Sequence, residues 1–276
     1  PRALMAALET SLVAANVDFD VNQQKFSLKC VTYGDNNSVC LFKIRLFKSA
    51  GVDELTCEFQ RRRGCVLTFR NVYRRVLSQL GSHLKTPAQP SAKSTGCVPL
   101  PIPVVDTETP SKEEFARTCM HLLNMASSRF VDVQREASIG LSNLSDSNIS
   151  SQNLTSGLEA EVLVNGLSRL LHSTESDIVR NAAVFFLNLL SAQSPLFEQH
   201  SLQNLMPTVF AVLSSPFSTF NADGKRQLLR GVAVLCQKNP SQNTQAVKPY
   251  VNVLDNLRHC SDASIRSSVD TISALI

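Results

Sequence analysis

The sequence lacks the motifs of several large classes of protein. Its 276 residues contain no glycine-rich phosphate loop, no H-R-D and no D-F-G triplet, so no phosphotransfer machinery is present. No apolar run is long enough to cross a membrane, and the first residues do not form a signal peptide. No arrangement of nucleophile, base and oxyanion donors can be assembled. We therefore predict that the chain is not an enzyme.

The cysteines also lack any chemical pattern. None of the eight belongs to a C-x-x-C pair, and none has a histidine at zinc-ligand spacing, so we predict no metal site and no cofactor. Free structural thiols are typical of a reduced, intracellular protein. We expect a cytoplasmic location, or a peripheral one at a membrane or the cytoskeleton. Because the chain begins at Pro1 and not at a methionine, we also expect it to be a fragment.

The net charge of +4 is unevenly distributed along the chain. Residues 1–85 carry 13 Lys and Arg against 7 Asp and Glu, which gives +6, whereas residues 86–276 carry 14 against 16, which gives −2. The basic character therefore belongs to the first part of the chain.

A proline-rich segment separates two patterned regions. Six of the twelve prolines fall between His83 and Ser111, where the hydrophobic periodicity fails. Such a composition is typical of an extended, semi-rigid linker. We predict a domain at 1–82, a linker at 83–111 and a second domain at 112–276.

The first domain has the pattern of an α+β fold. Leu4, Leu8 and Leu12 recur at helical spacing, and the helix is predicted to end near Asn16. Apolar residues then alternate with polar ones in three segments, which predicts three or four strands of one antiparallel, half-buried sheet: 26–30, 40–46 and 55–59. A period near 3.6 returns from Phe69 to Leu80, which predicts a second helix.

The second domain shows only helical patterns and an internal repeat. The segment 133–144, V-x-R-E-A-x-I followed by N-L, recurs 45 residues later at 178–189 as I-x-R-N-A-x-V followed by N-L. Weaker copies begin at Leu228 and Asp262. About four two-helix units follow from this spacing, and this region resembles a short HEAT or armadillo solenoid.

The first domain contains an ordered series of short motifs: N-V-D-F-D at 16–20, F-S-L-K-C at 26–30, F-K-I at 42–44, F-Q-R-R-R-G at 59–64 and T-F-R-N-V at 68–72. In this series, residues 3–82 resemble the kinase-associated domain at the C-terminus of AMPK-related and MARK-type kinases. Glu58 and Gln60 depart from the family, whose members often carry basic residues there.

The resemblance implies a regulatory function. Domains of this family bind anionic phospholipid head groups, and in several kinases they also hold the catalytic domain inactive. It implies that the partners are anionic membrane lipids and a kinase domain of the same polypeptide, located upstream of this fragment.

Basic residues form the candidate binding site of the first domain. Three contiguous arginines repel one another, and a folded protein gains little from such a cluster unless an anion lies nearby. The candidate residues, for anionic lipid or another acidic partner, are Arg61, Arg62, Arg63, Arg70, Arg74, Arg75, Lys43 and Arg45. The alternative is a solvated basic face without a ligand. Among acidic partners, lipid is favoured over nucleic acid because the patch lacks interleaved aromatics for base stacking.

The repeated arginines of the second domain are predicted to be structural. Arg135, Arg180, Arg230 and Arg266 recur at equivalent positions, where an arginine commonly pairs with an acid or a carbonyl of the next unit. Asn143 and Asn188 could instead line a peptide-binding groove. The leading hypothesis is a lipid-binding, kinase-restraining domain tethered to a helical scaffold for an unknown protein partner. The rival is a pure protein-interaction scaffold with no kinase and no lipid binding.

Overall fold

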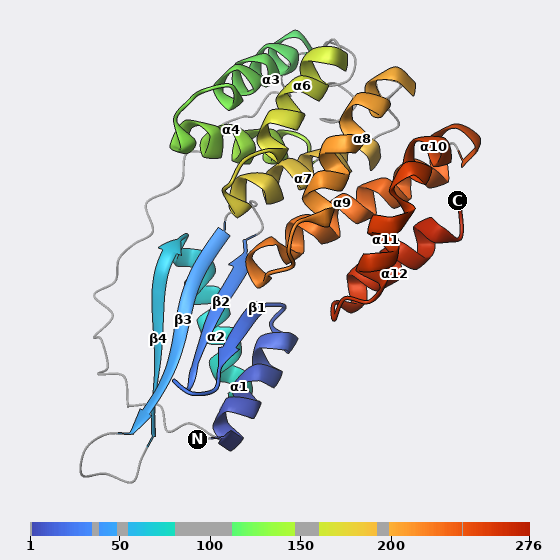
Figure 1. Cartoon of the computed structure of the whole chain (residues 1–276). Coiled ribbons are helices and arrows are strands. Elements are labelled where there is room, and N and C mark those ends of the chain that lie inside the picture. Colours follow the sequence, from blue (N-terminus) through green and yellow to red (C-terminus); the bar gives the residue numbers. More distant parts are fainter. Residues whose placement is uncertain are drawn as a thin grey trace. The chain divides into compact units, whose positions relative to one another are not determined.

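The structure is a computed structural model that describes residues 2–34, 39–48, 55–80, 112–146, 160–191, 199–238 and 240–276. The described elements fall into two compact units, one ending with the helix at Leu80 and the other beginning with the helix at Lys112 (Figure 1). The predicted linker at 83–111 lies outside the described residues. No helix in the described ranges is long and apolar enough to cross a membrane.

The first unit is a helix, a four-stranded antiparallel sheet and a second helix. Its elements are α1 (Arg2–Ala14), β1 (Asp18–Asn22), β2 (Ser27–Tyr33), β3 (Val39–Lys48), β4 (Leu55–Gly64) and α2 (Val66–Leu80). The strands pair in chain order, β1-β2-β3-β4. The α+β prediction is therefore confirmed in its element order. The sequence predicted three or four strands, and β1 is the one that lies outside the three predicted segments.

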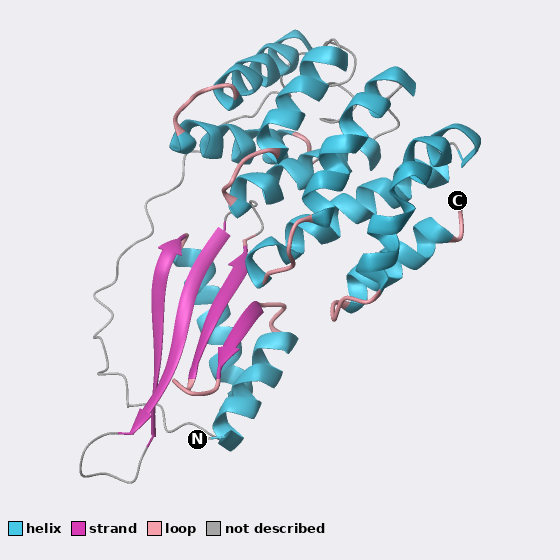
Figure 2. Ribbon diagram, in the orientation of Figure 1, coloured by secondary structure: helices cyan, strands magenta, loops and turns pink. Residues whose placement is uncertain are grey.

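The core of the first unit lies between the sheet and the two helices, which cover the same face of the sheet (Figure 2). Alternation places Leu28, Phe42 and Ile44 on this face, where they are buried. Two aromatic residues of α2 pack on aromatic residues of the strands. The ring centroids of Phe69 and Phe42 are 5.6 Å apart, and those of Tyr73 and Phe59 are 5.1 Å apart. Among the described residues of this unit, no helix covers the opposite face of the sheet.

The second unit is a two-layer helical repeat. Its helices are α3 (Lys112–Ala126), α4 (Val131–Leu144), α6 (Ala160–Leu171), α7 (Ser176–Ser191), α8 (Gln199–Ser214), α9 (Thr219–Lys238), α10 (Pro240–Val247), α11 (Val251–Arg258) and α12 (Ala263–Ser273), with a short 3₁₀ turn at Lys248–Tyr250. The first helices of successive units stack in one layer, α3, α6, α8 and then α10 with α11. The second helices stack in the other: α4, α7, α9 and α12.

A continuous hydrophobic core fills the space between the two layers. It includes Phe185, Phe186 and Phe210, all fully buried. The repeat predicted from the sequence is therefore confirmed as about four stacked units. The fourth unit differs, because its first helix is divided between α10 and α11.

Candidate functional site

The open face of the sheet carries a cluster of positive side chains, which we call the sheet-face cluster. Lys43 and Arg45 alternate with the buried residues of β3 and therefore point away from the helices. The pKa of Lys43 is lowered by partial burial and, after it, by the positive charges around it, those of Arg45, Arg62, Lys25 and Lys29. These five residues make up the sheet-face cluster.

Two members of the cluster, Lys25 and Lys29, were not among the candidates predicted from the sequence. Lys29 lies directly across from Lys43 in the register of β2 and β3. The signal was present, because Lys29 alternates with the buried Leu28 and Cys30 in the same way that Lys43 alternates with Phe42 and Ile44. Lys25 lies in the turn between β1 and β2, where its backbone N–H donates to Asn22 Oδ1 at 2.9 Å. The alternating pattern of the strands does not extend into this turn, so it could not predict Lys25.

Two acids lie beside the sheet-face cluster. Asp20 is across from Lys29 on β1, and Glu58 is across from Arg45 on β4. The five cluster residues and these two acids together carry a net charge of +3 by simple count. The departure at Glu58 therefore reduces the charge without reversing it.

The strand β4 delivers Arg62 to this face through a bulge. The pairing of β3 with β4 shifts between Leu41, which lies across from Arg63, and Phe42, which lies across from Arg61. Leu41 and Phe42 are neighbours on β3, but their partners Arg63 and Arg61 on β4 have Arg62 between them. Arg62 is therefore the extra residue of a β-bulge. Sequence alternation alone does not reveal a bulge, so it assigned no face to Arg62.

Arg61 lies in β4 across from Phe42, and its side chain reaches the turn from β4 into α2. Its Nη1 donates to the carbonyl of Gly64 at 2.7 Å. Gly64 has φ of +93°, and a Cβ there would lie 1.9 Å from the carbonyl oxygen of Val39. Only glycine fits this position, so the turn is tight and α2 begins directly beside the arginines.

The arginines of α2 form a second basic surface. Arg70, Arg74 and Arg75 are exposed on the side of the helix away from Phe69 and Tyr73. Because α2 covers the core face of the sheet, the eight predicted residues do not form a single flat patch. They divide between the open face of the sheet and the outer side of α2, and the arginines at 61–63 lie at the end of the sheet where the two meet.

The arginines of the first unit differ in their partners from the arginines that lie between units of the repeat. Residues 61–80 include six arginines and no acid. Among the residues that the structure describes, the side chains of Arg62, Arg70, Arg74 and Arg75 have neither an ion pair nor a hydrogen bond. In the helical repeat, the arginines that lie between units are paired with acids, whereas the exposed Arg117, Arg169 and Arg230 also lack such partners among the described residues.

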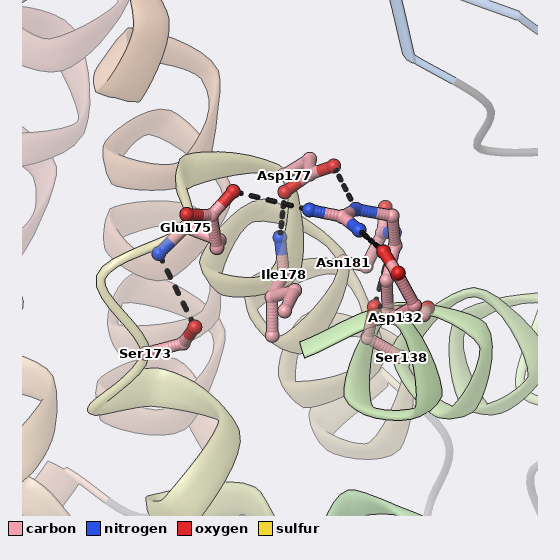
Figure 3. A network of polar contacts seen from close by, with 8 residues as sticks. Asp132, Ser138, Ser173, Glu175, Asp177, Ile178 and Asn181 are labelled. Carbon is pink, nitrogen blue, oxygen red and sulfur yellow. Dashed lines mark hydrogen bonds and ion pairs between the residues drawn. The ribbon is translucent and has the colours of Figure 1, made fainter. Parts of the chain in front are cut away.

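In the helical repeat, arginines connect successive units. Arg135 of α4 donates to Asp177 at 2.7 Å and to Glu175 at 3.0 Å, and both acids belong to the next unit. It also contacts Asp132 of its own helix at 2.5 Å, so three carboxylates surround one guanidinium (Figure 3). Arg180 of α7 pairs with Asp223 of α9 at 2.9 Å.

The third connection corrects the sequence prediction. Arg226, not Arg230, continues the series, and it binds Asp262 at 2.7 Å. Arg230 is exposed, and Arg266 donates to the carbonyl of Cys260 at 2.8 Å rather than to an acid. The faint third copy was therefore aligned one helical turn too late, whereas the structural role predicted for Arg135 and Arg180 is confirmed.

Polar side chains continue this connection deeper between the second helices. The amide of Asn181 donates to Ser138 Oγ at 3.3 Å, and that of Asn188 donates to Ser145 Oγ at 3.2 Å. The Asn188 side chain, which we considered for a peptide groove, thus binds the neighbouring unit. Asn143 is exposed.

The thiols have the character expected of structural cysteines. Seven cysteines lie in the described residues, where none forms a disulfide, and Cys97 lies outside them. Burial raises the pKa of Cys119 to about 12 and that of Cys57 to about 11, so these thiols stay protonated at neutral pH. No metal-binding group of histidine, cysteine and acidic side chains occurs within the described ranges.

Comparison with known proteins gives a fold likeness only. No protein-family model and no curated protein matches the chain. Among solved structures, the chain is similar to a computationally designed armadillo repeat protein for modular peptide recognition, at 13% identity and a TM-score of 0.45, over 60% of this chain and 74% of that one. It is also similar to an engineered protein, at 19% identity and a TM-score of 0.45, over 60% of this chain and 68% of that one.

A designed armadillo repeat protein in complex with the peptide (KR)4 is more distant, at 10% identity and a TM-score of 0.33, over 60% of this chain and 86% of that one. Likeness at this level carries nothing about function. The helical-repeat architecture follows from the stacking of the helices of this chain itself.

Proposed function

We propose that the first unit binds anionic phospholipid surfaces and that the helical repeat is a scaffold for protein partners. The observation that carries the proposal is the density of unpaired arginines in the first unit, where residues 61–80 hold six arginines and no acid. Every inter-unit arginine of the repeat has an acid within 3.0 Å, whereas four arginines of the first unit have no partner among the described residues. Concentrated positive charge without an acid costs stability through self-repulsion, and an external anion relieves that cost.

The chemistry of the surface favours a lipid head group over a nucleic acid. Single-stranded nucleic acids are held by aromatic side chains on which the bases stack. Among the described residues of the first unit, Phe47 is the only exposed aromatic side chain, and it is at the far end of β3 from Arg62. A phosphate-rich surface without bases needs only the charges that the unit presents.

The same unit is proposed to restrain a kinase domain. The order of helix, four antiparallel strands and helix supports the resemblance of residues 3–82 to the kinase-associated domain. A basic surface shared between lipid and an upstream kinase domain makes binding of one exclude the other, so anionic vesicles are expected to raise the activity of the full-length protein. A full-length gene without a kinase-like domain would remove this part of the proposal alone.

Co-sedimentation with vesicles tests lipid binding. We expect the protein to sediment with vesicles of phosphatidylcholine and phosphatidylserine but not with phosphatidylcholine alone. Salt near 1 M shortens the Debye length to about 3 Å and is expected to release it. No sedimentation, or equal sedimentation with both vesicles, would favour the rival: a pure protein-interaction scaffold with neither lipid nor kinase.

A further inference from the structure

The first turn of α2 exposes two apolar side chains, which we call the apolar tip. Val66 is 58% exposed and Leu67 is 65% exposed, although the helix they begin packs Val72, Val76 and Leu80 into the core. Exposing two aliphatic side chains next to each other loses the free energy that their burial would provide. Neither side chain belongs to the core of the first unit.

Positive charge surrounds the apolar tip on both sides along the chain. The arginines at 61–63 come directly before it, and the bond from Arg61 to the Gly64 carbonyl holds one of them at the turn. On the helix, Arg70 follows Leu67 by three residues and Arg74 follows it by seven, so these side chains lie along one face of α2. The outer face of α2 is therefore apolar in its first turn and basic beyond it.

We propose that the apolar tip inserts into the hydrocarbon region of an anionic leaflet while the surrounding arginines bind its head groups. This inference rests on the lipid binding proposed above and adds how the unit is oriented: the start of α2 faces the bilayer. Apolar side chains beside basic ones are the composition of segments that bind at the membrane interface, where burial of the apolar side chains and attraction to anionic lipid act together. A solvated basic face would not need the two aliphatic side chains.

The absence of tryptophan from the sequence allows a direct test. Leu67→Trp places the only indole of the protein at the apolar tip. With vesicles of phosphatidylcholine and phosphatidylserine we expect its emission to move to shorter wavelength and brominated acyl chains to quench it. Val13→Trp is the matched control, because Val13 is 68% exposed on α1, outside the arginine-rich segment 61–80, and its indole is expected to stay in water.

A second variant measures the contribution of the tip to binding. Leu67→Ser removes the aliphatic side chain without changing the charge, so we expect partitioning onto anionic vesicles to weaken by about tenfold at every salt concentration. Val13→Ser is expected to leave it unchanged. Thermal unfolding of each variant verifies that it folds.

The outcomes separate this inference from the proposed function. A protein that sediments with anionic vesicles while the indole of Leu67→Trp shows neither a shift nor quenching binds lipid through charge alone, which overturns insertion and leaves lipid binding in place. A protein that does not sediment overturns both. Equal shifts for Leu67→Trp and Val13→Trp would also overturn insertion at α2.

Discussion

The buried ion pair of Arg180 and Asp223 is the residue-scale feature whose loss should matter most for the repeat. Both side chains are largely buried, with Nε and Oδ2 2.9 Å apart. Removing one partner leaves an uncompensated buried charge, so we expect Arg180→Ala to lower the free energy of unfolding of the repeat by about 3–5 kcal/mol.

The control is Arg258→Ala, which breaks the half-exposed pairs with Asp255 and Asp270. Exposed pairs contribute about 0–1 kcal/mol. Urea unfolding of the two variants gives the comparison. Equal losses would show that Arg180 and Asp223 do not act as a buried pair.

Asp262 gives the repeat a dependence on pH. Burial opposes ionisation, but the hydrogen bonds from Arg226 and from the backbone N–H of Ile265 outweigh it and lower the pKa of this carboxyl. A carboxyl with a lower pKa in the folded state stabilises the fold above its unfolded pKa of about 3.9, and this stabilisation is lost as pH falls through the folded value.

Asp262→Asn isolates this effect because asparagine also serves as an N-cap for α12. We expect the variant to be less stable than the natural protein at pH 7 and the difference to disappear as pH falls below about 3.9. Urea unfolding across this range measures it. A constant difference at all pH values would mean that the charge of Asp262 is not the cause.

At the scale of elements, the close packing of the second helices depends on small residues. Ala137 and Ala182 occupy equivalent positions of α4 and α7, and both are fully buried. We expect leucine at either position to destabilise the repeat by about 1–3 kcal/mol, because an added side chain forces neighbouring side chains or backbones to move.

Ala211→Leu on the exposed side of α8 is the matched control. It adds the same atoms where they meet solvent and should change stability by less than about 0.5 kcal/mol. Thermal unfolding compares the three variants. An unchanged midpoint for Ala137→Leu and Ala182→Leu would show that the assigned packing of these helices is wrong.

Much of the element order could be predicted from sequence, because periodicity records which side of an element is buried. Alternation placed Lys43 and Arg45 on the open face of the sheet, and the repeat of R-E-A and R-N-A placed Arg135 and Arg180 between units. The bulge that turns Arg62 to the open face leaves no mark in the alternation. Arg226 was missed since Arg230 matched a short motif better, although pairing with Asp262 depends on where the helices lie in space.

At the scale of the whole molecule, the two units differ in the surroundings of their arginines. The repeat carries arginines paired with acids, which hold stacked helices in register, and its part of the chain has a net charge of −2 over residues 86–276. The first unit, within the +6 segment, presents arginines at the surface. An interaction with an anionic surface should therefore depend on the first unit and not on total charge.

The most direct test of this account is vesicle binding by two charge-matched triple variants. Arg62, Arg70 and Arg74 are replaced by glutamate in the first, and the exposed Arg117, Arg169 and Arg230 of the repeat in the second. Each basic residue near an anionic membrane contributes about 1 kcal/mol, so the first variant should partition at least about a hundredfold more weakly onto phosphatidylserine vesicles. The second should bind like the natural protein. Equal binding by the two variants would contradict the account.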